Sequence, residues 1–186
     1  MAFWSFVLAA PLLALGLFVL LAPAKAGTSL LTFPRNVLAG RILCAVGWFW
    51  TASACDRLGI DVFDKFLKAF PGELWILAVV LTVLTCWWME NLLPIRGVAA
   101  VCMLFPGEMF PAIRLCDTSW RIALVVFAYL CAIFGMFAMF YPWWIRKGLD
   151  WLVARPSLLR GTGGALAATG ALFTVLGILS AAGVLK

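Results

Sequence analysis

Long apolar runs, each close to the length that crosses a bilayer, are the feature of this sequence that most restricts its fold. The first run, residues 2–22, carries no charged side chain. A helix needs about 20 apolar residues to span the hydrocarbon core. Hydrophobic residues make up 66% of the chain and charged residues 12%, whereas a soluble domain has about 25% charged residues. The sequence therefore predicts an all-α membrane protein. It argues against a soluble enzyme, a disordered chain or a nucleic-acid binder.

Six segments are expected to cross the membrane as one polytopic transmembrane helix bundle. Their approximate bounds are 2–22, 37–55, 74–92, 97–113, 122–141 and 161–185. The fourth contains Phe105-Pro106-Gly107-Glu108, so it either spans with a kink or forms a re-entrant turn in its second half. Two short interfacial helices are expected at about 61–70 and 143–155, where apolar residues recur at helical spacing among charged ones.

The first span and the orientation of the bundle leave alternatives open. Ala24-Lys25-Ala26 resembles a cleavage site, but the chain begins without the basic region of a signal peptide, which favours a retained span. With six spans, the 14 lysines and arginines divide into six on one side and eight on the other. This difference does not decide which side is cytoplasmic.

The residue types present limit the chemistry. The chain has no histidine, the commonest metal ligand and general base, and its six cysteines form no C-x-x-C pair. We therefore expect no catalytic residues, no metal site and no bound haem, copper, zinc or iron–sulfur cofactor. Cys55 and Cys116 both lie near predicted membrane edges, but their spacing alone does not establish a disulfide between them.

Two motifs indicate a family. Arg41 heads an apolar run with small residues that closes at Arg57-Leu58, and Leu92-Leu93-Pro94-Ile95-Arg96-Gly97-Val98-Ala99-Ala100 joins a short basic turn to alanine-rich sequence. With these motifs, residues 41–139 resemble the DoxX-like family of small four-helix membrane proteins. The resemblance implies a four-helix bundle at about 37–141, with one span added before it and one after. It also implies a link to quinone-coupled redox systems or to the maturation of dehydrogenases.

Arg41 is the first candidate for a binding residue, because it lies about four residues inside its predicted span. A charge at depth costs about 2.5–3.5 kcal/mol on insertion scales. Its candidate partners are Glu90 and Glu108. An Arg–Glu pair could hold an anionic or quinone-like headgroup. The alternatives are that the pair is purely structural or that Arg41 extends to the headgroups.

The last span carries a predicted packing surface. Gly163, Gly170 and Gly177 are seven residues apart, and Ala167 and Thr174 lie between them on nearly the same face. Small residues at this spacing allow a second helix to approach closely. The pattern predicts helix–helix contact and does not indicate chemistry.

Together these features predict a non-catalytic integral membrane subunit, or an accessory or maturation factor, of a quinone-linked redox system. The alternative is a small-solute or lipid transporter, which requires polar groups at mid-membrane. Few residues could supply them: Thr82, Thr85, Tyr129 and Arg41. A quinone-reactive enzyme is a third, weaker hypothesis.

The expected partners are the lipid bilayer and other membrane subunits. Nucleic acid is not expected, because the basic residues flank apolar runs. The expected location is a bacterial cytoplasmic (inner) membrane.

Overall fold

The computed structural model describes residues 2–58, 73–88, 92–114 and 118–183 of the 186-residue chain. Within these ranges every regular element is a helix, which confirms the predicted all-α bundle. Five helices are long and apolar enough to cross a membrane: α1 (Ala2–Leu21), α3 (Val37–Leu58), α6 (Leu93–Arg114), α7 (Arg121–Phe140) and α9 (Pro156–Ala181). The third expected span corresponds to α5 (Glu73–Trp88), an apolar helix of 16 residues. The chain is therefore a multi-pass integral membrane protein.

Three shorter elements lie between the long helices. They are α2 (Pro23–Thr32), the single 3₁₀ turn η1 (Phe33–Arg35) and α8 (Pro142–Val153). Pro142 begins α8 and Pro23 begins α2, because a missing N–H and a fixed φ suit the first helical position. A helix was expected at 143–155, and α8 confirms it with an earlier end at Val153. No helix was predicted at α2, and the interfacial helix expected at 61–70 lies outside the described residues.

The fourth expected span is one continuous helix. α6 runs from Leu93 to Arg114 with Pro106 and Pro111 inside it, so the re-entrant alternative is wrong. Prolines are tolerated in membrane helices where neighbouring elements cover the freed backbone groups. Pro106 is buried, and Met109 and Ile113 beyond it belong to a core shared with other helices. Packing therefore holds the second half of α6 in line with the first.

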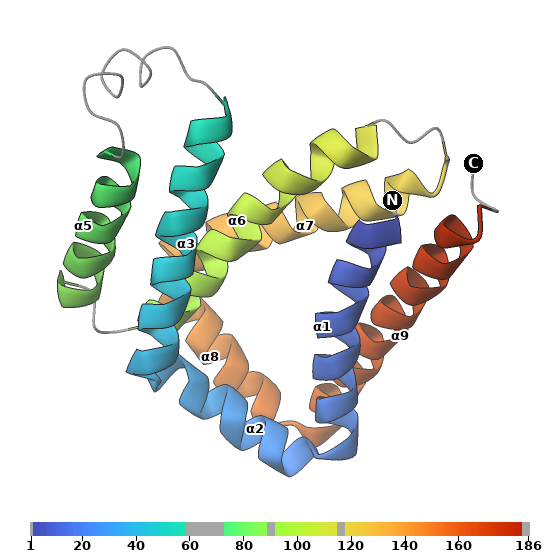
Figure 1. Ribbon diagram of the computed structural model, residues 1–186. Coiled ribbons are helices and arrows are strands. Elements are labelled where there is room, and N and C mark those ends of the chain that lie inside the picture. The colour runs from blue at the N-terminus through green and yellow to red at the C-terminus, as the bar shows by residue number, and fades with distance from the viewer. Residues whose placement is uncertain (1, 59–72, 89–91, 115–117, 184–186) are drawn as a thin grey trace.

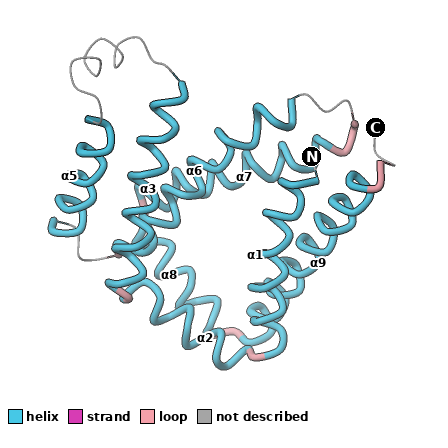
Figure 2. The backbone as a smooth tube through the Cα atoms, in the orientation of Figure 1, coloured by secondary structure: helices cyan, strands magenta, loops and turns pink. Residues whose placement is uncertain are grey.

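The helices pack mainly in pairs, and these pairs define the shape of the molecule. In Figure 1 the pairs α1–α9, α6–α7 and α2–α8 form three sides of a triangle, and α3 and α5 stand beside one corner. The tube in Figure 2 shows the same arrangement, with α3 packed on α6 and α5 on α3. The largest buried cluster lies where α1, α6, α7 and α9 meet, and includes Leu8, Met109, Leu124 and Phe173. A second cluster of Val19, Ala26 and Leu159 joins α1, α2 and α9.

The directions of the helices define two ends of the bundle. α1 leads into α2 at one end, and α9 starts from that same end after α8 (Figure 1). α3 and α6 run parallel from this end, because Gly40 lies against Pro94 and Gly47 lies against Ala100. We call this the α2–α8 end. The N-terminus of α1 and the C-terminus of α9 lie at the opposite end.

Candidate functional site

A pocket of about 390 Å³ lies among α3, α5, α6 and α7. Its lining residues are Cys44, Gly47, Trp48, Thr51, Thr85, Leu93, Arg96, Gly97, Ala100, Met139 and Phe140. We call it the Arg96 pocket. Small side chains shape its walls: a Cβ on Gly97 would lie 2.5 Å from the Cβ of Leu43, so α3 and α6 can approach only because position 97 is glycine.

The polar groups of the Arg96 pocket are few and mostly bound within the protein. Trp48 Nε1 donates a hydrogen bond to Thr85 Oγ1 at 3.0 Å, and Thr51 Oγ1 donates to the Gly47 carbonyl at 2.8 Å. Arg96 supplies the charge among the described lining residues. A guanidinium has five N–H donors and no acceptor. One cation on apolar walls suits an amphiphile whose head accepts hydrogen bonds and whose body is apolar.

A second polar cluster joins α3 to α6. Arg57 donates from Nη1 to Glu108 Oε2 at 2.7 Å and from Nη2 to Glu108 Oε1 at 2.6 Å. Trp50 Nε1 donates to the same Oε1 at 3.2 Å, and Arg57 also reaches the Ser53 carbonyl and hydroxyl. The side chain of Arg57 is 56% exposed and that of Glu108 is 21% exposed. This geometry satisfies both carboxylate oxygens and fixes the register of the two helices.

The hypothesis that Glu108 pairs with Arg41 is wrong, because its partner is Arg57. α3 and α6 are parallel, so Arg41 lies at the level of the start of α6. Arg57 lies 16 positions further along α3, which is about 24 Å at 1.5 Å per residue. The Arg41 side chain is exposed, and no described residue forms a hydrogen bond or ion pair with it. The other candidate partner, Glu90, lies outside the described residues.

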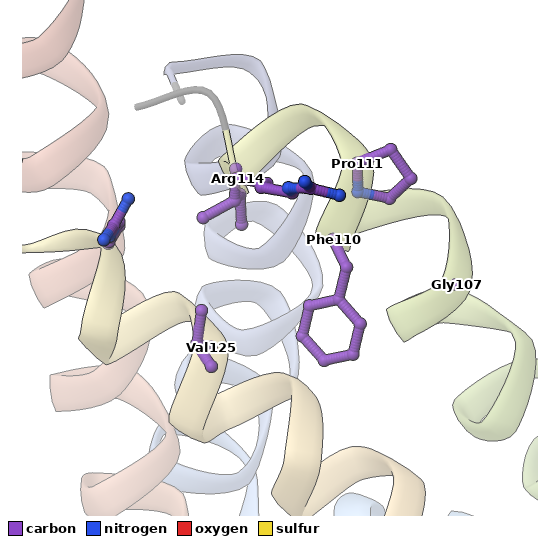
Figure 3. Close-up of a pocket in the computed structure, with 7 residues that line it drawn as sticks. Gly107, Phe110, Pro111, Arg114 and Val125 are labelled. Carbon is purple, nitrogen blue, oxygen red and sulfur yellow. The ribbon is translucent and has the colours of Figure 1, made fainter. Parts of the chain in front are cut away.

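A larger pocket, of about 500 Å³, lies at the end of the bundle opposite α2–α8. It is lined by Gly107, Phe110, Pro111, Ile113, Arg114, Arg121 and Val125. In Figure 3 the Arg114 side chain extends toward Pro111, and Phe110 and Val125 project from α6 and α7. Arg114 and Arg121 are both exposed. This pocket is a wide surface hollow, and its chemistry is less defined than that of the Arg96 pocket.

The predicted packing surface of α9 lies against α1. Gly163, Gly170 and Gly177 are buried there, opposite Val19, Leu13 and Phe6 respectively. Ala167 contacts Gly16 of α1, and Thr174 Oγ1 donates to the Gly170 carbonyl at 2.9 Å. These five residues therefore lie at or beside a helix–helix contact and line neither of the two pockets.

Sequence reasoning did not identify Arg96, Arg57 or Trp48 as site residues. Arg96 was recognised only as part of a basic turn between two spans. Its position in a pocket depends on how four helices meet. The one signal that could have marked it is the run of small residues directly after it, Gly97, Ala99 and Ala100, which permits close helix contact.

Within the described residues, no three of His, Cys, Asp and Glu come together as a metal site. Cys55 is a free thiol, and Cys116 is not among the described residues.

No protein-family model, curated protein or solved structure matches the chain. Its helices identify it as a multi-pass integral membrane protein, and its described residues include a half-open pocket with Arg96 in its lining.

Proposed function

We propose that this protein is a non-catalytic membrane subunit, or an accessory or maturation factor, of a quinone-linked redox system in a bacterial cytoplasmic membrane. In this role it holds a quinone-like amphiphile in the Arg96 pocket. The redox context comes from the resemblance to the DoxX-like family, and the ligand class comes from the pocket.

The Arg96 pocket is the observation that carries the proposal. Its volume of about 390 Å³ lies within the range of small-molecule sites, about 300–1,000 Å³. Met139, Phe140 and Leu93 offer apolar contact to a ring or a chain. Arg96 offers charged donors to a carbonyl or carboxylate oxygen. A quinone head has this combination of an apolar ring and carbonyl acceptors.

Binding of a short-chain ubiquinone to the detergent-purified protein tests the ligand class. Quenching of tryptophan fluorescence is the readout, because Trp48 lines the pocket. A hydrogen bond to a charged group contributes about 1.5–3 kcal/mol, so Arg96→Gln is expected to weaken binding about 10- to 100-fold. Arg41→Gln, an exposed arginine near the same end, is the matched control and should leave the affinity unchanged. Trp48→Phe should remove most of the quenching signal. Equal affinities for the wild type, Arg96→Gln and Arg41→Gln would refute the site.

Purification in mild detergent tests the role. A stoichiometric partner that carries flavin, haem or quinone is expected for a subunit. The same pocket also fits the acyl chain and acidic head of a lipid, which favours a lipid carrier as the second candidate. A protein without partners that retains a phospholipid in native mass spectrometry, and loses it on Arg96→Gln, would support the carrier and contradict the subunit.

A further inference from the structure

Positive charge is concentrated at one end of the bundle. The described cations at the α2–α8 end are Lys25, Arg35, Arg41, Arg96, Arg146, Lys147, Arg155 and Arg160, with Asp150 as the described acid. At the opposite end the described cations are Arg57, Arg114 and Arg121, and the described acidic side chains are Asp56 and Glu108. Counted over the residues whose side chains the structure describes, which leaves out Glu73 of α5, the charges sum to +7 at the α2–α8 end (8 − 1) and to +1 at the other (3 − 2). Most of this difference comes from the described cations, eight against three, and the acids add one further unit.

Tryptophans of α8 lie against two of these cations, Lys147 on α8 and Arg155 directly after it. Lys147 Nζ lies 5.1 Å from the ring centroid of Trp143 and 5.8 Å from that of Trp144. Arg155 Cζ lies 4.5 Å from the ring of Trp151. The three indoles remain about half exposed, at 55%, 55% and 52%. Indole rings favour the headgroup level of a bilayer, so we expect Lys147 and Arg155 to lie at that level.

α8 is attached to the bundle by its other face. Ile145 packs on the cluster of Ile95, Ala99 and Ala138, and Leu152 packs on the cluster that contains Leu159. The helix lies across the end of the bundle beside α2 (Figure 1). Its Trp–Lys–Arg face is therefore held in a fixed position at the membrane boundary and is not covered by the chain's own core.

We propose that the α2–α8 end binds the phosphates of anionic phospholipids through the cation–tryptophan face of α8, and that this end lies at the cytoplasmic leaflet. Anionic headgroups neutralise the excess charge, and each lysine or arginine at such a surface strengthens binding roughly fivefold. A zwitterionic surface would leave the excess uncompensated. The N-terminus of α1 and the C-terminus of α9 then lie on the opposite side of the membrane.

Thermal unfolding in nanodiscs tests the lipid charge. The wild type is expected to melt at least about 3 °C higher in discs with 30% phosphatidylglycerol than in pure phosphatidylcholine discs. High salt should remove most of this difference, because exposed charges are screened. This control uses the wild-type protein alone. Equal melting temperatures in the two lipids would overturn the proposal.

Two charge-matched variants locate the effect. Lys147→Glu/Arg155→Glu should abolish the dependence on phosphatidylglycerol, and Arg114→Glu/Arg121→Glu makes the same charge change at the other end and should retain it. The neutral pair Lys147→Gln/Arg155→Gln should weaken the dependence without adding repulsion. Equal loss in the two glutamate variants would contradict a specific role for α8.

The orientation has its own readout. Alkaline phosphatase fused after Lys186 should be active in a bacterial host, and green fluorescent protein fused at the same residue should be dark. The opposite result would place the α2–α8 end outside the cytoplasm and overturn the assignment.

Discussion

Glu108 is the most heavily bonded acidic side chain among the described residues. It accepts two hydrogen bonds from Arg57 and one from Trp50, so three hydrogen bonds from two side chains hold one carboxylate between α3 and α6. Its position inside the fourth predicted span marked Glu108 as a candidate, but its partner could not be predicted. Pairing depends on the parallel packing of α3 and α6, and a single sequence does not specify which helices are neighbours.

A double-mutant cycle on this ion pair should show coupling. Arg57→Ala and Glu108→Gln are each expected to destabilise the protein, and the double variant should lose about 1 kcal/mol less than the sum, because the bidentate bond is removed only once. Unfolding in detergent measures the three variants and the wild type. Arg41→Ala, which removes an exposed arginine, should change stability little. Strict additivity of the two changes would show that the pair contributes no stability.

At the scale of elements, the α1–α9 contact shows what periodicity can and cannot predict. The seven-residue spacing of glycines marked the contact face of α9. It did not identify α1 as the partner, because α1 is apolar on every side and has a single buried glycine, Gly16. Gly97 and Gly135 are just as tightly packed, against Leu43 and Met103 respectively. Gly135 is the single glycine of α7, and the other glycine of α6, Gly107, is ten residues from Gly97, so no seven-residue repeat marked them.

Two glycine-to-alanine changes on α9 should have opposite effects. A Cβ at position 170 would lie 2.7 Å from the Leu13 backbone nitrogen, so Gly170→Ala must separate the helices and should cost about 1–3 kcal/mol. Gly164 has no atom within 4 Å of an added Cβ. Gly164→Ala should therefore be neutral or stabilise by up to about 1 kcal/mol through helix propensity. Melting temperatures in detergent would decide.

A larger change at the same position extends this test. Gly170→Leu should lower stability further than Gly170→Ala, whereas Leu172→Ile alters a side chain that is 46% exposed and should matter little. Similar melting temperatures for Gly170→Leu and Leu172→Ile would mean that this face of α9 lies against lipid.

At the scale of the whole molecule, hydropathy predicted the helices but not their arrangement. The expected bounds agree with the long helices to within a few residues, because apolar run length follows bilayer thickness. The neighbours of each helix remained unknown, since lipid and protein contacts both favour apolar side chains. α2 was missed because its ten residues, PAKAGTSLLT, are too few to span a bilayer and include only two large apolar side chains, Leu30 and Leu31.

The first and last helices, α1 and α9, lie side by side, and an engineered disulfide can test this contact. In the antiparallel pair, a Cβ at Gly163 would lie 2.9 Å from the Cβ of Val19, whereas a Cβ at Gly164 meets nothing within 4 Å. Disulfides need Cβ atoms about 3.5–4.5 Å apart, a separation that a small shift at position 163 provides. Val19→Cys/Gly163→Cys should therefore form a disulfide under mild oxidation, and Val19→Cys/Gly164→Cys should not.

A protease site inserted at the turn beside Arg155 makes this disulfide visible. Cleavage there separates α9 from the rest of the chain, so only a disulfide between α1 and α9 keeps the fragments together on a non-reducing gel. The wild type with the same insertion controls for the native cysteines. Cross-linking in the Gly164 pair but not in the Gly163 pair would require α9 to be rotated on α1, and the buried cluster that joins both helices to α6 and α7 would then have to be packed differently.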